Sequence, residues 1–447
     1  MKSEWNESGS GFSLPEESLC GTAVKRDVNQ VVNPRTALRA AIEDTAGDVV
    51  AIASRLVSAV SENPPGDTGA IAHAIVDVLR PVANVDVEVI ESEAPVANVV
   101  ARLNGRGPGR RLVFNGHLDT FPAGDRAQWE SDPFTLAERH GKLYGRGISD
   151  MKGGVACAIY AMKTLAGWRN DWSGELVLTF AGDEESMGRL GTQYLLDHVP
   201  FAVGDAMVCG DAGSPRVLRF GEKGMVWMEV TAHGHASHGA HVHLGDNAIE
   251  LLVEALRKLT SLRDMPVDTP NDASAAMQAA ARVSEALSGK GESDVLRRVT
   301  VNVGTIEGGT STNLVPDVAR ASLDIRIPLG VTVAQLEAEI AKLLTPMHGI
   351  DYRITNRYEP SYTDPDHEII TTTRDVCEEI IGERPVVNMR VGASDSRLYR
   401  YRGVPTVVCG LTPHAMGGAN EHVMADELNA LAKIFVLTAF DFLQRTT

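Results

Sequence analysis

The sequence predicts an α/β fold with a central, mostly parallel β-sheet and a smaller α+β domain inserted into the larger one. Short strands that are apolar throughout alternate with helical stretches, as expected when helices cover a parallel sheet. Residues 221–358 differ, because two strands follow each other across a short loop and are flanked by helices. Acidic and imidazole side chains also stand at the ends of several predicted strands.

The change in pattern divides the chain into three stretches. We expect residues 1–220 and 359–447 to build the larger domain, and residues 221–358 to form the insertion. A length of 447 residues suits this division, since single domains are usually about 100–200 residues long. Residues 1–30 mix Ser, Gly, Glu and Asn without apolar periodicity, so we expect a loose arm there.

The larger domain is predicted to begin with helices and then to alternate strand and helix. Apolar side chains recur every three or four residues from Pro34 to Val60, and the prolines and glycine of residues 63–66 end this helix. A second helix at 70–79 leads into a strand at 85–90. Later strands are expected at 112–114, 176–180, 206–209 and 404–409, with helices at 156–165 and 192–196.

The insertion is expected to contain one small sheet with helices beside it. Its predicted elements, in chain order, are a strand at 225–231, a helix at 247–262, strands at 300–306 and 319–327, and a helix at 333–344. Residues 263–291 are rich in Asp, Ala, Ser and Pro, and we expect them to elaborate this insertion.

Composition and charge exclude several classes of protein. Lys and Arg number 42 against 59 Asp and Glu, and the net charge of −17 argues against nucleic-acid and membrane-surface partners, which need basic patches. The longest apolar runs, such as 155–162, are far shorter than the roughly 18–20 residues that cross a bilayer. The N-terminus lacks the layout of a signal peptide and the cysteines form no C-x-x-C pair, so a cytoplasmic location is expected.

The chemistry of the sequence is concentrated where predicted strands end. His117 and Asp119 follow the first of the later strands, residues 183–185 follow the second, Asp211 follows the third, and His414 follows the last. Open α/β sheets bind ligands at the carboxyl ends of their strands. One acid there is usually a solvated residue or a helix cap, but four strand ends together predict a shared site. So many carboxylates need a cation, and oxygen and nitrogen donors without thiolates suit Zn²⁺, Mn²⁺ or Co²⁺.

Three motifs lie in order along the chain: N-G-H-L-D-T at 115–120, G-R-G-I-S-D-M-K-G-G at 145–154 and D-E-E at 183–185. Together they resemble the metallohydrolase family of acetylornithine deacetylases, succinyl-diaminopimelate desuccinylases and glutamate carboxypeptidases. The likeness runs from the turn at 63–66 to Asn420-Glu421, and the ten-residue motif is its most specific part. The resemblance implies that the larger domain is a metal-binding catalytic domain and that the insertion is a dimerisation or lid domain.

The resemblance also implies a set of metal ligands. His117 would be a terminal ligand of one metal, Asp211 would complete that site, and Asp150 would bridge two metals. Glu185 would bind the second metal. The expected cofactor is therefore one or two divalent ions per subunit, Zn²⁺ or Mn²⁺, with Co²⁺ also suitable.

Three catalytic residues follow from the same resemblance. Glu184 would be the general base that moves a proton from metal-bound water to the leaving amine, and Asp119 would hold the His117 imidazole. His235 would reach the partner subunit's site and polarise the scissile carbonyl. The alternative is that His235 belongs to a group of surface histidines or a metal-binding tract with His233, His238, His241 and His243.

Substrate-binding residues implied by the resemblance lie in both domains. Asn313, in the loop 308–315, would help to hold the oxyanion or the substrate. Arg326 and Arg397 would grip a substrate carboxylate, because guanidinium offers a bidentate fork. Ser394 lies in the same segment as Arg397 and is expected to contact the substrate too. The alternative for either arginine is a structural ion pair.

The sequence departs from the family pattern near its C-terminus. The family has its last metal-ligating histidine a few residues before the acid that corresponds to Glu421, but Gly417 occupies that position here. A glycine has no side chain to bind a metal. Either the glycine-rich loop folds back so that His414 supplies the imidazole, or the second metal site is weak or empty. His422 is expected to point away.

The expected function is that of a divalent-metal-dependent hydrolase that cleaves the C–N bond of a small carboxylate-bearing amide, such as an N-acyl amino acid or a dipeptide. If His235 acts in the partner's site, the active unit is a homodimer or a higher homo-oligomer. One alternative is an aminohydrolase that releases ammonia from an aromatic amine such as a nitroanthranilate. A non-catalytic binding protein on the same fold is disfavoured, because the expected base and all but one of the expected ligands are present.

Overall fold

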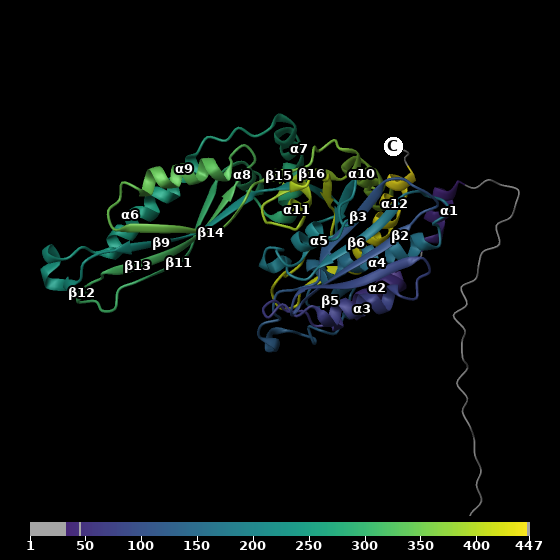
Figure 1. Cartoon of the computed structure of the whole chain (residues 1–447), viewed down its shortest axis with the longest axis horizontal. Coiled ribbons are helices and arrows are strands. Elements are labelled where there is room, and N and C mark those ends of the chain that lie inside the picture. The colour runs from purple at the N-terminus through teal and green to yellow at the C-terminus, as the bar shows by residue number, and fades with distance from the viewer. Residues whose placement is uncertain (1–32, 44–45, 445–447) are drawn as a thin grey trace, which may run out of the picture.

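The computed structural model describes residues 33–43 and 46–444 and contains a larger and a smaller layered unit (Figure 1). The larger unit is built on a nine-stranded sheet, and the smaller one on a four-stranded sheet. The arm predicted for residues 1–30 lies outside the described residues. Within the described ranges, no helix has both the length and the hydrophobicity needed to cross a bilayer.

The large sheet is parallel at its centre and antiparallel towards its edges. Its order is β1-β2-β6-β3-β7-β17-β8-β15, with β16 beside β8. β3 pairs in parallel with β6 and β7, which confirms the predicted α/β class. β1 and β2 are antiparallel, because the two residues between them leave no room for a crossover. The strands are β1 Val85–Glu93, β2 Val96–Asn104, β3 Arg111–His117, β6 Glu175–Ala181, β7 Ala206–Cys209, β8 Val217–Glu222, β15 Ser361–Tyr362, β16 Val386–Arg390 and β17 Thr406–Val408.

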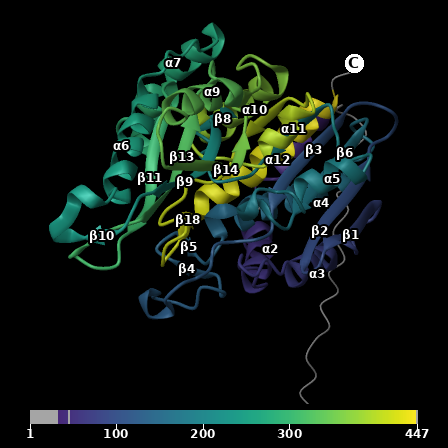
Figure 2. The same ribbon diagram turned by 60° about the vertical axis from the view of Figure 1, so that its left-hand side comes forward.

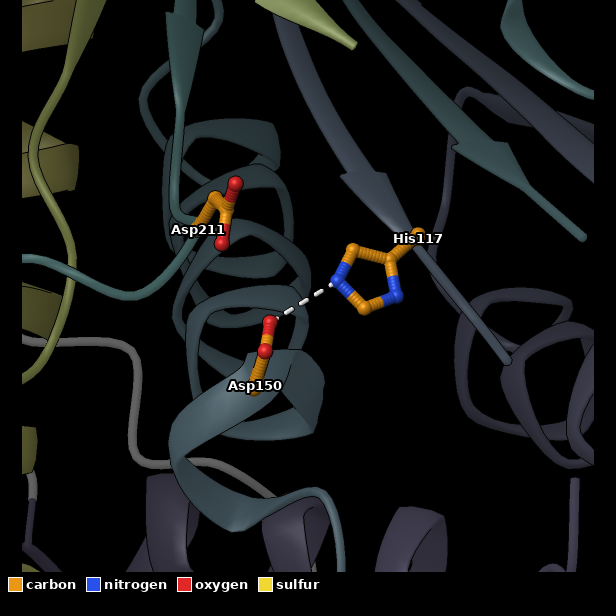
Figure 3. A group of neighbouring side chains, drawn as sticks. All are labelled: His117, Asp150 and Asp211. Carbon is orange, nitrogen blue, oxygen red and sulfur yellow. Dashed lines mark hydrogen bonds and ion pairs between the residues drawn. The ribbon is translucent and has the colours of Figure 1, made fainter. Parts of the chain in front are cut away.

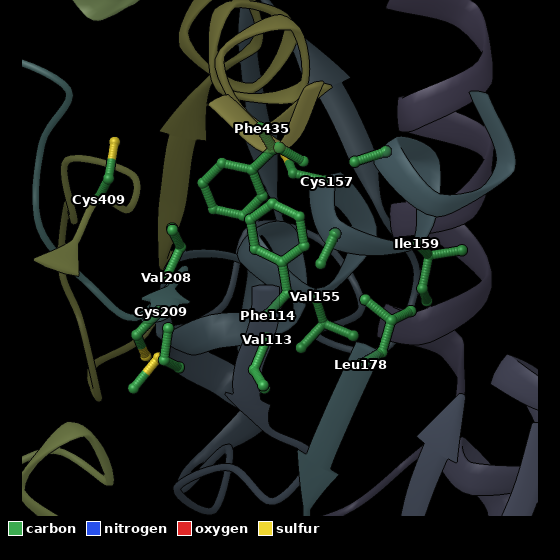
Figure 4. Packing of buried hydrophobic residues seen from close by; sticks show 14 of the residues in the cluster. Val113, Phe114, Val155, Cys157, Ile159, Leu178, Val208, Cys209, Cys409 and Phe435 are labelled. Carbon is green, nitrogen blue, oxygen red and sulfur yellow. The ribbon is translucent and has the colours of Figure 1, made fainter. Parts of the chain in front are cut away.

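Helices cover both faces of this sheet, since adjacent residues of a strand face opposite sides. In β3, Phe114 stacks on Phe435 with ring centroids 4.7 Å apart, in the apolar core that Figure 4 shows. The next residue, Asn115, donates to the Thr192 hydroxyl on the other face (3.1 Å). The helix predicted from Pro34 is two helices. The helices of the larger unit are α1 Pro34–Ala41, α2 Ala46–Ser58, α3 Gly69–Leu79, α4 Gly153–Ala166, α5 Thr192–His198, α10 Glu368–Ile381, α11 Ser396–Tyr401 and α12 Ala425–Gln444.

The smaller unit is an antiparallel sheet of order β11-β13-β9-β14, against which α6 and α9 pack (Figures 1 and 2). It has an apolar core of its own, which includes Val226, Leu252 and Ile340. The three strands predicted here are present, and β14 adds a fourth. The elements between the two halves of the large sheet are β9 Gly224–His233, β10 Ser237–His238, α6 Ala248–Thr260, α7 Asn271–Ser288, α8 Glu292–Arg297, β11 Thr300–Gly308, β12 Leu314–Val315, β13 Val318–Ile327, α9 Val333–Leu344 and β14 Ile350–Tyr358.

Part of this stretch returns to the larger unit. Residues 263–291 were expected to elaborate the insertion, but they include α7, which packs against β16. Ala273 and Met277 of this helix belong to the apolar core of the large sheet. The Arg219 Nη1 atom of β8 also lies 3.1 Å from Glu292 Oε1, and both side chains are buried. These contacts tie the smaller unit to the larger one.

A three-stranded sheet holds the C-terminal loop beside the large sheet. β5 pairs with β4 and with β18, so that Tyr144 lies opposite His422. A buried ion pair between Arg146 Nη1 and Glu421 Oε2 (2.6 Å) fixes the loop before β18. The strands are β4 Ala137–Arg139, β5 Lys142–Tyr144 and β18 His422–Met424, and the short helical turns of the chain are η1 Arg126–Gln128, η2 Ile148–Lys152, η3 Glu184–Ser186, η4 Gly239–Leu244 and η5 Ser261–Asp264.

Two glycines let α4 begin directly against the end of β7. A Cβ on Gly154 would lie 2.1 Å from the Gly210 carbonyl oxygen, and a Cβ on Gly210 would lie 2.9 Å from the Gly154 Cα atom. Neither position has room for a side chain. The contact holds the start of α4 against the turn that follows β7, and so brings Asp150 and Asp211 to the same edge of the sheet.

Replacing Gly154 with alanine should lower the free energy of unfolding by about 1–3 kcal/mol, because the added methyl group must push two backbone segments apart. Gly107→Ala is the matched control, since a Cβ there would meet no atom within 4 Å. Urea denaturation of both variants measures the difference. An effect of Gly154→Ala no larger than that of the control would contradict this packing argument.

Candidate metal centre and active site

Three side chains that can bind a metal converge at the carboxyl edge of the large sheet. His117 ends β3, Asp211 follows β7, and Asp150 lies in η2 just before α4 (Figure 3). One ligand atom of each residue lies within 4.8 Å of those of the other two. The His117 Nε2 atom is 3.0 Å from Asp150 Oδ1. The group forms because β3 and β7 are parallel neighbours that end at the same edge.

Burial makes charge in this group costly. His117 and Asp211 are only 2% and 3% exposed. Burial opposes the charged form of His117, but hydrogen bonds with Asp119 and Asp150 raise its pKa well above the usual value. Burial raises the pKa of Asp211 to about 6, although Arg390 opposes the shift. The group therefore needs positive charge among its carboxylate oxygens.

The donor set fits a divalent cation. The His117 Nδ1 atom donates to the Asp119 carbonyl oxygen (2.9 Å), which leaves Nε2 to bind a metal. Glu185 lies outside the group of three, but its Oε1 atom is buried and has no hydrogen-bond partner among the described residues. One imidazole nitrogen and several carboxylate oxygens, without thiolates, suit Zn²⁺ or Mn²⁺.

Asp119 holds the acidic turn that follows β6. Its Oδ1 and Oδ2 atoms accept the backbone N–H groups of Glu184 (3.2 Å) and Glu185 (3.1 Å), and Asn63 Nδ2 donates to Oδ2 (2.8 Å). Its carboxylate is 3.5 Å from His117 Nδ1, farther than the carbonyl oxygen that accepts from that atom. Asp119 thus orients the imidazole mainly through its backbone and the two glutamates through its side chain.

Both glutamates of this turn hold a proton more tightly than usual. Burial raises the pKa of Glu184 well above its ordinary value; His117 opposes the shift and the neighbouring Asp395 adds to it. Burial likewise raises the pKa of Glu185 to about 8. A carboxylate whose pKa is raised binds a proton more strongly than an ordinary one, which suits a general base.

The structure does not bring His414 into the metal-binding group. His414 forms an antiparallel backbone bridge with His422, the two rings stack at 4.9 Å, and His422 contacts the Tyr144 ring at 4.7 Å. Gly417 lies in the loop between them, where its carbonyl oxygen accepts from Arg146 Nη2 (3.1 Å). Across the described ranges, no group of three or more candidate ligands includes His414. This geometry does not favour the ligand role predicted for His414.

Arg390 is a site residue that the sequence analysis missed. It ends β16, and its Nη1 atom donates to Asp211 Oδ2. Burial lowers the pKa of Arg390, but Asp211, Glu222 and Asp150 more than compensate, so the guanidinium stays charged. The sequence did offer one indication. Arg390 stands just before the 392–397 segment, in which the resemblance implies the substrate-binding residues Ser394 and Arg397.

The two predicted carboxylate-gripping arginines meet at Tyr358, the last residue of β14. Arg326 Nη1 donates to the Tyr358 hydroxyl (3.1 Å), and the Arg397 guanidinium lies 5.0 Å from the centre of the same ring. Arg326 also forms a two-point ion pair with Asp324 (2.7 and 3.0 Å), and Arg397 Nη1 donates to the Ser394 carbonyl oxygen (2.7 Å). Both arginines therefore have protein partners where the two units join.

His235 and Asn313 lie apart from this group within the chain. Both are near β10 and β12, at the end of the smaller unit that points away from the large sheet (Figure 1). His235 pairs through its backbone with Asp246 (2.9 and 3.0 Å), and its side chain is exposed. Asn313 is exposed too, and its Oδ1 atom accepts from the Ser311 hydroxyl (2.6 Å).

Known proteins resemble this chain both in sequence and in fold. A sequence model of peptidase family M20/M25/M40 matches residues 113–441. A succinyl-diaminopimelate desuccinylase from Paracoccus denitrificans is 30% identical over 399 residues, which cover 87% of this chain and 96% of that protein. A metallo-carboxypeptidase from Sulfolobus solfataricus has a similar fold (TM-score 0.74, 17% identity, 89% of this chain and 100% of that one). So does a dipeptidase from Saccharomyces cerevisiae (TM-score 0.74, 15% identity, 93% and 100%).

Adding Mn²⁺ to metal-stripped protein should raise its melting temperature by several degrees, and by more at about pH 7.5 than at about pH 5.5. At the lower pH, His117, Glu184 and Glu185 keep protons that compete with the metal, because their pKa values are raised. The folded metal-free protein binds these protons more tightly than the unfolded chain, so its own stability falls as the pH rises through this range. Scanning calorimetry measures both effects, and equal metal-induced shifts at the two pH values would contradict the assignment.

Proposed function

Because the chain belongs to peptidase family M20/M25/M40, we propose that it hydrolyses the C–N bond of a small carboxylate-bearing amide, such as an N-acyl amino acid or a dipeptide. Membership of this family confirms the resemblance in its motifs and makes the protein a metal-dependent hydrolase acting on C–N bonds. The observation that carries the proposal is the group of His117, Asp150 and Asp211 with Glu184 beside it. The names of two similar proteins, a desuccinylase and a dipeptidase, indicate the substrate class.

The metal site of the proposal consists of His117, Asp150 and Asp211, and the Glu185 carboxyl group lies close to it. A divalent cation such as Zn²⁺ or Mn²⁺, when bound there, polarises a carbonyl oxygen and makes water easier to ionise. Asp119 orients the groups that would bind this cation. Its carbonyl oxygen fixes the His117 ring, and its carboxylate fixes the turn that carries Glu185.

Glu184 is the general base of the proposal. It is buried, its backbone is anchored by Asp119, and its carboxyl group has a raised pKa. Its carboxylate takes a proton from the attacking water and returns it to the nitrogen of the leaving amine. Water therefore adds to the carbonyl carbon, the C–N bond breaks, and the products are a carboxylic acid and an amine.

Replacing Glu184 with glutamine should lower kcat by about 10²–10⁴-fold, because the amide cannot carry the proton. The bound metal per chain and the melting temperature of the metal-loaded protein should stay close to those of the unchanged protein. Glu88→Gln, an exposed position on β1, is the matched control. Unimpaired turnover by the Glu184 variant would remove this residue from the mechanism.

A substrate screen tests the reaction class itself. Metal-loaded protein is offered N-acyl amino acids, dipeptides and aromatic amines, and the products are analysed for free amino acid, carboxylic acid and ammonia. We expect release of an amino acid together with a carboxylic acid or a second amino acid. Release of ammonia from an aromatic amine, with neither of these products, would favour the aminohydrolase alternative.

We also propose that the active unit is a homodimer in which the partner subunit's His235 completes the site. Strand β11 is an edge of the small sheet, and its Ile306 is 57% exposed. Ile249 and Val253 of α6 are exposed as well, and Ile249 lies against Gly308 of β11. An exposed apolar strip along an unpaired strand edge is a surface that proteins normally cover. A second copy would cover it.

Mixing two inactive variants tests this arrangement. Glu184→Gln and His235→Ala should each be nearly inactive alone. A subunit exchange between them produces mixed dimers with one intact site, so about a quarter of the unchanged activity should return. The absence of any recovery, with exchange verified by mass spectrometry of the assembled dimers, would place His235 outside the partner's site.

A further inference from the structure

Arg390 holds a fixed positive charge inside the carboxylate cluster. Its guanidinium donates to Asp211 Oδ2 and is only 17% exposed. Asp211 is one of the three residues of the metal-binding group, and its other carboxylate oxygen accepts the Ala212 backbone N–H (2.5 Å). An arginine engaged in this way has little freedom to bind a substrate. Its immediate effect is to neutralise and position a metal ligand.

The set of ligands that the resemblance implies for a second ion is incomplete in this chain. Asp150 and Glu185 are present, but the position that resembles the family's last ligand is Gly417. The imidazoles of His414 and His422, which flank Gly417 in the sequence, are stacked on each other. Two carboxylates alone make a weak site for Zn²⁺ or Mn²⁺, which bind better with a third protein donor.

Charge counting connects these two observations. Asp150, Glu184, Glu185 and Asp211 carry up to four negative charges in one largely buried region, and such charges persist only when they are compensated. Two divalent ions would supply four positive charges. One divalent ion and Arg390 supply three, so the fixed guanidinium provides part of the compensation that a second ion would otherwise give.

We propose that this site binds a single divalent ion, held by His117, Asp150 and Asp211, and that Arg390 takes over the electrostatic role of a second ion. The inference rests on the proposed function, because it assigns the number of ions to the same metal centre. Arg390 is a positioning residue here: it acts through Asp211, whose carboxylate it holds beside Asp150.

Metal counting on the unaltered protein is the first test. Protein stripped of metal and reloaded with Mn²⁺ should contain one ion per chain by elemental analysis, with the electron paramagnetic resonance spectrum of an isolated Mn²⁺ ion. Two ions per chain with an exchange-coupled spectrum would overturn this inference and leave the proposed function intact. No bound ion would overturn the proposed function itself.

Substitution of Arg390 is the second test. Arg390→Met should lower the melting temperature of the metal-free protein by several degrees, and Mn²⁺ should recover most of this loss, so the metal-induced shift becomes larger than in the unchanged protein. Arg390→Lys, which keeps the charge, should restore most of the metal-free stability. A purely structural role would lower both melting temperatures equally, and equal metal-induced shifts would overturn the role given to Arg390.

Restoring a ligand is the third test. Gly417→His combined with Arg390→Met should bind two ions per chain, since an imidazole is added and a competing cation is removed. A Cβ at Gly417 would meet only Phe121 (3.6 Å), and histidine tolerates the positive φ of 72° better than most residues do. His414→Ala is the control and should keep one ion. A double variant that still binds one ion would show that these two positions do not set the metal number.

Discussion

The structure depends on compensating negative charge where parallel strands end. Asp150, Glu184, Glu185 and Asp211 occupy one largely buried region, and each uncompensated charge there would cost several kcal/mol. Interactions between charged groups, whether repulsive or attractive, are stronger in the protein interior than in water. The raised pKa values of three of these carboxyl groups express that cost. A cation bound among these carboxylates would compensate their charge and make the same arrangement a reactive centre.

The backbone around the site is organised to hold these groups together against their repulsion. The contact between Gly154 and Gly210 places the start of α4 against the end of β7. Asp119 uses both carboxylate oxygens to hold the acidic turn and its carbonyl oxygen to hold the imidazole. The buried ion pair between Arg146 and Glu421 fixes the glycine-rich loop that precedes β18. These contacts hold the donor groups in place without a bound cation, which is the preorganisation that metal catalysis requires.

The sequence was informative where the signal is local. Strands that are apolar on both faces predicted the parallel centre of the large sheet, and a specific ten-residue motif predicted the neighbourhood of Asp150. The failures involve long-range packing. Residues 263–291 have a composition that suits an exposed elaboration, yet α7 returns to β16, and this depends on contacts between distant segments. Arg390 was missed for a related reason: it stands close to the 392–397 segment, but only the fold brings the end of β16 to Asp211. The roles of the individual site residues stay predictions.

Anomalous diffraction from crystals of the metal-loaded protein tests the central claim most directly. At the absorption edge of Zn or Mn, the difference map should show a peak about 2.0–2.2 Å from His117 Nε2 and from one carboxylate oxygen each of Asp150 and Asp211. A map without anomalous density among these three side chains, recorded from crystals soaked to saturation, would contradict the claim that a divalent ion compensates the buried carboxylates.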